Sequence, residues 1–330
     1  PHVAKFAPPT LDAYQEVMAG LEVCLERPEV GLEHFRRAAE LDPGYVPARL
    51  FIVHSLFDGL RRFDEGRAEL EELATWRHLM GSFDRLCVDC VVLLRAQRYE
   101  EAIPLLQEIV LLDPGNPLIS PGMVNALAWT NRPHQAIAAF ERNTEPHKGG
   151  LGQVFSACMA FHLLGEHERE LEVAQDALAR FPTIGGDFRW GLLGNAVVAL
   201  AAMGRSSEAS VLIDRVHRDP NAAFVFGGPE ASRIWLAWQA SAELAVHGWP
   251  EEGRRIAEQS LERSPPTATQ PPWTRWCLVL LMQQTDRVDD ARALLDQLVT
   301  DNPDQLYIVG LAAATSAHAG DREAVEEGLR

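Results

Sequence analysis

The cysteines are the residues of this chain that are best suited to bind a metal or to carry out redox chemistry. The chain has 330 residues and five cysteines, and only Cys87 and Cys90 have the spacing of a ligand pair, Cys-Val-Asp-Cys. A zinc site needs a second pair of ligands, but Cys24, Cys158 and Cys277 lie far away in the sequence. The odd count and scattered positions also argue against a disulfide framework. We therefore predict buried structural cysteines, no metal site and a reducing, cytoplasmic compartment.

No catalytic or cofactor-binding pattern is recognisable in the sequence. None of the eleven histidines forms a His-Glu-x-x-His or comparable ligand set. His162 and His167 flank a turn, and we interpret them as surface or half-buried imidazoles. The glycine-rich stretch 149–152 lacks the lysine of a P-loop, and no Gly-x-Ser-x-Gly elbow occurs. The sequence thus predicts a protein that is not an enzyme and uses no cofactor.

Six of the eight tryptophans gather between residues 190 and 276. Trp235 and Trp238 are three residues apart, as are Trp273 and Trp276, so each pair shares a helix face. Two interpretations stay open: all of them are core residues, or at least one lines a binding surface. We expect the main binding surface for a partner to lie here. The residues expected to form it are Trp190, Phe224, Phe226, Trp235, Trp238, Trp273, Trp276, Phe155 and Met159.

Phe224 and Phe226 belong to a loop at 219–229 that is bounded by proline and glycine. Their side chains either pack over neighbouring helix ends or reach into the binding surface, and both alternatives stay open. The helix positions that we expect to face a bound partner are apolar or aromatic rather than basic. They are Cys87, Val91, Phe155, Met159, Val198, Trp238, Ala242, Trp276 and Leu280.

The helices that must position these residues are marked by a signature that recurs nine times. It consists of a small residue, a bulky one four residues later, an apolar or small one three after that, and often a proline, as in Gly31-Phe35-Ala38-Pro43. Spacings of four and three define one face of an α-helix, and the proline ends it. The nine first positions are Gly31, Gly66, Ala102, Ala136, Glu170, Ala209, Gly253, Ala291 and Ala324. Their steps of 33 to 44 residues, most of them close to 34, indicate stacked helix pairs.

Turn and helix-start residues support the same interpretation. Acidic residues such as Asp64 and Glu65 precede the small position, where the unpaired N–H groups of a first helical turn favour negative charge. Glycines such as Gly165, Gly204 and Gly248 supply the preceding turn.

This signature resembles the tetratricopeptide repeat family, from about Leu11 to Arg330. The resemblance implies an all-α solenoid of about nine helix pairs, roughly 18 helices, wound as a right-handed superhelix with the first helix of each pair on the concave face. We expect near-regular repeats one to five in 1–185, and repeats six to nine, with loop insertions, in 186–330. The two stretches are expected to be parts of one continuous solenoid rather than separate domains.

The resemblance also implies a function, namely a non-catalytic scaffold that binds a peptide or a partner domain in an apolar, aromatic concave groove. A sensor arm is an alternative, because segments such as 163–171 and 200–205 look like the C-terminal repeat region of multi-domain bacterial regulators. Such an arm of a kinase or transcription factor would bind a small molecule. A third alternative is a self-assembly module. The chain starts at Pro1 without methionine and stops within the ninth repeat, so we expect a segment of a longer protein.

The charge of the chain narrows the class of partner. The net charge is −17 and the pI about 5.1, and the longest basic clusters are Arg61-Arg62 and Arg254-Arg255. Nucleic acids and anionic lipids need a basic surface, so we expect neither as a partner. No apolar run is long enough to span a membrane. The expected partner is a protein or peptide, with a domain of the same polypeptide as one alternative.

Overall fold

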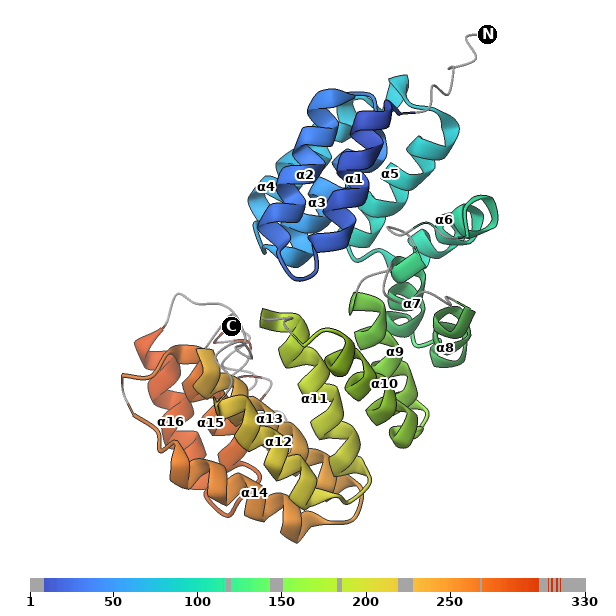
Figure 1. Ribbon diagram of the computed structural model, residues 1–330. Coiled ribbons are helices and arrows are strands. Elements are labelled where there is room, and N and C mark those ends of the chain that lie inside the picture. The colour runs from blue at the N-terminus through green and yellow to red at the C-terminus, as the bar shows by residue number, and fades with distance from the viewer. Residues whose placement is uncertain are drawn as a thin grey trace. The chain divides into compact units, whose positions relative to one another are not determined.

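The computed structural model describes residues 9–114, 116, 120–142, 151–182, 186–218, 228–267, 269–302, 308, 310, 313 and 315. Over these residues every regular element is a helix, which confirms the predicted all-α fold. The chain forms two compact units, Pro1–Ile184 and Gly185–Arg330, here called the N-terminal and the C-terminal unit. Each is a stack of helix pairs (Figure 1).

Sixteen α-helices occur in the described part of the chain. The N-terminal unit contains α1 (Leu11–Val23), α2 (Pro28–Leu41), α3 (Val46–His54), α4 (Phe63–Thr75), α5 (Ser82–Arg95), α6 (Tyr99–Leu112), α7 (Ser120–Trp129), α8 (Pro133–Arg142), α9 (Leu151–Leu163) and α10 (His167–Arg180). A π-helix, η1 (Ser55–Gly59), continues α3, and a 3-10 turn, η2 (Arg77–Leu79), follows α4. The C-terminal unit contains α11 (Gly186–Ala202), α12 (Ser206–Arg218), α13 (Gly228–Val246), α14 (Pro250–Arg263), α15 (Pro272–Met282) and α16 (Val288–Asp301).

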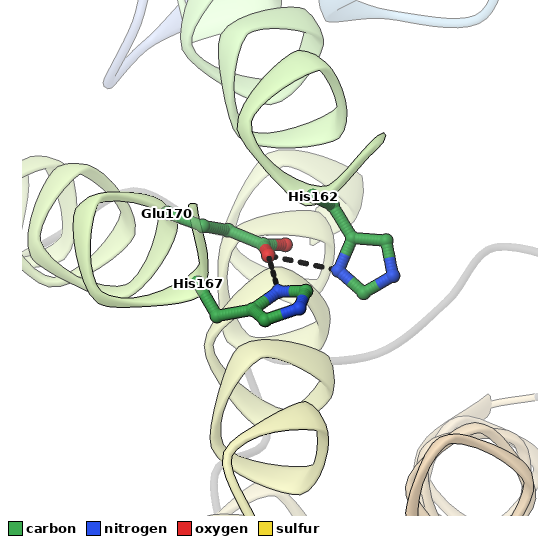
Figure 2. A group of neighbouring side chains, drawn as sticks. All are labelled: His162, His167 and Glu170. Carbon is green, nitrogen blue, oxygen red and sulfur yellow. Dashed lines mark hydrogen bonds and ion pairs between the residues drawn. The ribbon is translucent and has the colours of Figure 1, made fainter. Parts of the chain in front are cut away.

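The recurring small residue sets the start of the second helix in every pair. Each even-numbered helix begins three residues before it, from Pro28 before Gly31 to Val288 before Ala291. The position is buried in all eight pairs, because it faces the first helix at short range. At Gly31, an added Cβ would stand 2.6 Å from the Cβ of Cys24, so only a very small residue fits there. The exception is Glu170 in the fifth pair, whose side chain is buried beside two histidines (Figure 2).

The turn between the two helices of a pair is also repeated. Six turns hold a residue with positive φ five residues before the small position, and in five of them the residue after it donates a backbone hydrogen bond to the carbonyl five residues earlier, as Arg98 does to Leu93. This pattern is a Schellman-type helix end. The positive-φ residues are Arg61, Gln97, Asn131, Gly165, Gly204 and Gly248. Three of them are not glycine, so the turn is imposed even where the residue type disfavours it.

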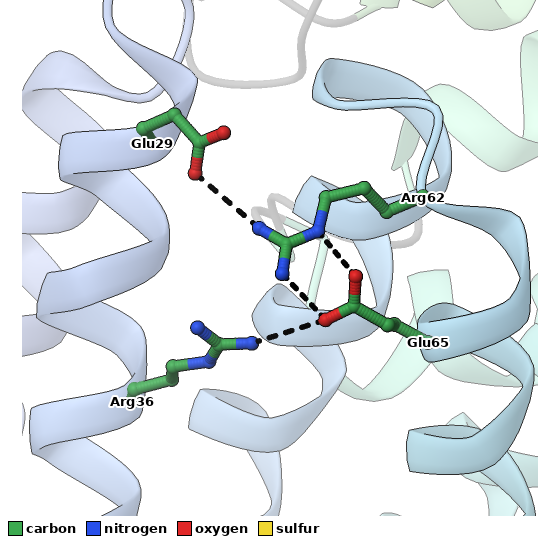
Figure 3. Close-up of polar contacts among 4 residues, drawn as sticks. All are labelled: Glu29, Arg36, Arg62 and Glu65. Carbon is green, nitrogen blue, oxygen red and sulfur yellow. Dashed lines mark hydrogen bonds and ion pairs between the residues drawn. The ribbon is translucent and has the colours of Figure 1, made fainter.

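An ion pair closes many of the same turns. In Figure 3, Arg62 at the start of α4 donates two hydrogen bonds to Glu65, one turn into the helix, and its remaining amino group reaches Glu29 of the preceding pair at 3.5 Å. Arg36 contacts the same Glu65 at 3.7 Å. The arrangement recurs at Arg98–Glu101, Arg205–Glu208 and Arg287–Asp290. The side chains of these ion pairs are largely exposed, so each pair alone contributes little to stability. The positions of the acidic residues confirm the prediction that acids occupy the first turn of the second helices.

The core runs between the pairs as well as within them. In the first repeats, the rings of Phe35 and Phe51 stack with centroids 5.0 Å apart, which joins α2 to α3. Phe35 is the bulky residue of the signature and is almost completely buried, as the sequence predicted. No helix in the described ranges has the length and apolarity needed to cross a bilayer.

The structure describes eight of the nine expected pairs. The ninth repeat, with Ala324, lies outside the described residues. The right-handed superhelix, the continuity of the solenoid, and the contrast between 1–185 and 186–330 stay predictions.

Candidate functional site: a tryptophan cluster

Four tryptophans come together on two neighbouring first helices of the C-terminal unit. Trp235 and Trp238 lie on α13, Trp273 and Trp276 lie on α15, and α13 packs against both α11 and α15. Trp273 and Trp276 follow Trp235 and Trp238 by 38 residues, which is also the step between Gly253 and Ala291. The two pairs therefore occupy equivalent positions in successive repeats, and the stacking of the repeats brings them face to face.

The four indoles, which we call the tryptophan cluster, are in continuous ring contact. Trp235 lies 4.8 Å from Trp238, 5.8 Å from Trp273 and 5.7 Å from Trp276, measured between ring centroids. Trp273 and Trp276 are 4.9 Å apart. Stacked and tilted arrangements at these distances are favourable for aromatic pairs. Trp235 is the centre of the cluster, because it contacts all three other rings.

Burial within the cluster is graded. Trp276 is 9 % exposed, whereas Trp235, Trp238 and Trp273 are half-buried. The indole nitrogens of Trp235 and Trp276 are shielded from solvent, and among the described residues neither has a hydrogen-bond partner. A buried N–H group without an acceptor is unfavourable. The cluster thus offers half-exposed aromatic surface together with two N–H donors that have no acceptor among the described residues.

Two buried arginines lie close to the four tryptophans in sequence, and neither was among the predicted site residues. Arg275 on α15 has only 4 % of its side chain exposed and donates a 2.8 Å hydrogen bond to Asp301. Arg233 on α13 donates a hydrogen bond to Ser264, and burial lowers the pKa of its guanidinium. Both arginines link a first helix to the end of the following second helix. Their signal in the sequence is a basic residue within two positions of a tryptophan in a first helix.

The remaining predicted site residues are Trp190, Phe224, Phe226, Phe155 and Met159. Trp190 is half-buried on α11 of the same unit. Phe224 and Phe226 lie outside the described residues. Phe155 and Met159 are half-buried on α9, in the N-terminal unit.

Trp249, which the sequence places in the same stretch, has a different position. Its indole lies against Gly204, where an added Cβ would stand 2.6 Å from the ring. It therefore joins the turn of the sixth pair to the start of α14 in the seventh.

The cysteines occupy interior positions. None of the five is in a disulfide in the described structure, and Cys87, Cys90, Cys158 and Cys277 are buried, as predicted for packing residues. Burial raises the pKa of both Cys87 and Cys90 to about 12, so their thiols are protonated at neutral pH.

Comparison with known proteins agrees with the repeat interpretation. The sequence model of the tetratricopeptide repeat matches residues 93–148. The solved structure of Cut9 with Hcn1, from an APC/C hetero-tetramer, is similar over 91 % of this chain and 55 % of that chain, with 14 % identity and a TM-score of 0.55. The apo form of the quorum sensor NprR from B. thuringiensis is similar over 82 % and 81 %, with 13 % identity and a TM-score of 0.50. No curated protein sequence matches the chain.

These likenesses concern the fold. The repeated helix pairs of this chain are arranged as in tetratricopeptide repeat proteins, and the family model matches one part of the chain, residues 93–148. At such low identity the solved structures support the fold alone, and the chain spans only about half of the Cut9–Hcn1 chain that it matches.

Proposed function

We propose that this protein is a non-catalytic scaffold that binds an extended, apolar peptide segment of a partner on the tryptophan cluster. The observation that carries the proposal is the pair of buried indole N–H groups, on Trp235 and Trp276, within a surface of half-exposed rings. A peptide that displaces the side chains around these donors would supply backbone carbonyls to them, and its own side chains would pack on the half-buried rings. Aromatic-lined surfaces on regular scaffolds are a recurring mode of peptide recognition.

The charge distribution supports an apolar rather than a charge-driven interaction. The chain has a net charge of −17, and acidic residues recur in the first turns of second helices, some in exposed pairs such as Arg205–Glu208, while the cluster is aromatic. Binding energy in such a surface comes from the burial of aromatic area. We therefore expect the affinity to vary little with ionic strength, unlike that of a charge-steered complex.

The test is selection of binding peptides from a random display library on the purified chain, followed by affinity measurement with variants. Trp238→Ala should weaken binding by about 2 kcal/mol, roughly 30-fold, because aromatic anchors dominate such interfaces. Trp235→Phe keeps the ring but removes the N–H donor, so it should weaken binding less while thermal unfolding stays close to that of the wild type. Trp129→Ala, at a tryptophan that is 56 % exposed on α7, is the matched control and should not change binding.

The proposal fails if peptides bind equally to the wild type and to Trp238→Ala, or if their contacts map to α1–α10. It also fails if binding leaves tryptophan fluorescence unchanged. The sensor-arm and self-assembly alternatives stay predictions, since no contact in the described structure favours them.

A further inference from the structure

The fifth pair departs from the repeat signature at its most constrained position. Seven other pairs in the described structure hold glycine or alanine there, whereas α10 holds Glu170. The Glu170 side chain is 1 % exposed. A buried carboxylate is unfavourable unless a positive charge or several hydrogen-bond donors compensate it. The residues around Glu170 must therefore supply the groups that compensate its buried carboxylate.

Two histidines converge on one oxygen of this carboxylate (Figure 2). The Nδ1 atom of His162 lies 2.9 Å from Oε2 of Glu170, and Nδ1 of His167 lies 3.6 Å from the same atom. The two imidazole rings are 4.9 Å apart. A ligand atom from each of the three residues lies within 4.8 Å of the others.

The local fold explains why these residues meet. His162 is in the last turn of α9 and His167 is the first residue of α10, on either side of the turn that Gly165 closes with φ +72°. Glu170 follows one turn into α10. The same turn is repeated along the chain, so the placement of the three side chains rests on the most regular part of the fold.

We propose that His162, His167 and Glu170 bind a divalent transition-metal ion of the zinc class. Imidazole nitrogen and carboxylate oxygen are ligands that zinc prefers, at bond lengths of about 2.0–2.2 Å. Tetrahedral coordination at those lengths separates two ligand atoms by about 3.3 Å, and the observed separations of 2.9 and 3.6 Å from Oε2 bracket that value. Calcium and magnesium prefer sets made entirely of oxygen, so this donor set excludes them.

The described residues supply three ligands, and the two histidines are the more exposed of them. His162 has 25 % of its side chain exposed and His167 has 11 %, whereas Glu170 is enclosed. A fourth ligand, either water or a side chain of a bound partner, would reach the ion from the histidine side. The Cys158 thiol donates a 3.7 Å hydrogen bond to the backbone carbonyl of Glu170, so its sulfur is directed at the backbone and is not one of the proposed ligands.

The first experiment uses the full chain without a histidine tag, treated with chelator and titrated with ZnCl₂. Titration calorimetry should show that the wild-type chain binds one zinc ion, and that this binding requires His162, His167 and Glu170. Zinc at a hundredfold excess over its Kd should raise Tm by roughly 5–10 °C, because the ion binds the folded state. Glu170→Ala restores the small residue of the other pairs, so it should fold, and it should weaken zinc binding by more than about 100-fold. His162→Gln, at the more exposed ligand, should also abolish the rise in Tm.

The matched control is His34→Gln, which removes another histidine–carboxylate pair, His34–Glu16 at 2.7 Å, and should leave the zinc response intact. X-ray absorption of the zinc-loaded protein should show nitrogen and oxygen ligands at about 2.0–2.1 Å. A zinc–sulfur distance of about 2.3 Å would contradict the donor set. If the wild type binds no zinc, or if Glu170→Ala binds it as well as the wild type, the cluster is only a hydrogen-bonded carboxylate and the proposal is wrong.

Discussion

Ser241 and Gly253 hold α13 and α14 in backbone contact. The Ser241 hydroxyl donates a 2.8 Å hydrogen bond to the Gly253 carbonyl, and a Cβ added to Gly253 would stand 2.5 Å from the Ser241 carbonyl oxygen. The same relationship appears in the fifth pair, where Cys158 donates to the carbonyl of Glu170. In these two pairs, the residue that donates to the carbonyl of the small position lies twelve positions before it.

Replacing Gly253 with alanine should destabilise the C-terminal unit by about 1–3 kcal/mol. The new methyl group would clash with a backbone carbonyl, which cannot move aside by a change of rotamer as a side chain can. The measurement is the midpoint of urea unfolding. Gly152→Ala on α9 is the control, since nothing lies within 4 Å of a Cβ at that position. It should be neutral or stabilising. Equal losses in both variants would show that the backbone contact is not the cause.

Replacing Gln97 with glycine should stabilise the N-terminal unit by up to about 1 kcal/mol. Gln97 has φ +57°, and a left-handed residue other than glycine is strained by about 1–2 kcal/mol, partly offset by the entropy that glycine loses on folding. Gly165→Ala, at the same repeat position with φ +72°, should have the opposite effect. Thermal unfolding of the two variants tests the pair, and a loss of stability in Gln97→Gly would contradict it.

The ion cluster around Asp58 should make the stability of the N-terminal unit sensitive to acid. Burial alone would raise the pKa of the Asp58 carboxyl, but the charges and hydrogen bonds of His54 and Arg95 outweigh it and lower the pKa below the ordinary value. Tyr99 is the other titratable group that interacts with it. A lowered pKa contributes stability above the unfolded value, near 3.9, that is lost as pH falls through the folded value.

Asp58→Asn should therefore reduce the unfolding free energy by about 1–2 kcal/mol at pH 7, a value between those of exposed and buried pairs. The difference from the wild type should shrink as the pH falls below about 5. Repeating the comparison in a His54→Gln background separates the titration of the histidine from that of Asp58. A difference that grows in acid would contradict the assignment.

The thiols of Cys87 and Cys90 should resist modification in the folded protein. With pKa values near 12, the thiolate fraction at pH 8 is on the order of 1 in 10,000, and both side chains are buried. A thiol reagent followed by mass spectrometry should label them only after denaturant is added. The double change to alanine should leave peptide binding to the tryptophan cluster intact. Rapid labelling of either cysteine in the native state would contradict this prediction.

The second helices were predictable from the sequence because their packing constraint is local. The acid of the first turn, the small residue and the bulky residue four positions later all lie within one short segment of the same helix. Each second helix starts at a fixed distance from its small residue. The turns were less predictable. Positive φ at Arg61 and Gln97 has no signal in the residue type, because glycine is the residue that usually marks it.

The candidate sites depend on contacts that sequence spacing does not show. The three-residue spacing of Trp235 and Trp238 predicted a shared face, but the contact with Trp273 arises only when two repeats stack. His162 and His167 were interpreted as surface or half-buried imidazoles. The residue that both of them contact, Glu170, is visible in the sequence only as a departure from the small residue of the repeat signature.

Trp249 gives the C-terminal unit a mechanical property. Its indole rests on the turn at Gly204 while its backbone begins α14, so one side chain belongs to two successive pairs. In a linear array, the sharpness of the melting transition depends on how strongly each repeat is coupled to the next. Because the Trp249 ring contacts both pairs, we expect it to couple their unfolding, so that the two pairs unfold together rather than independently.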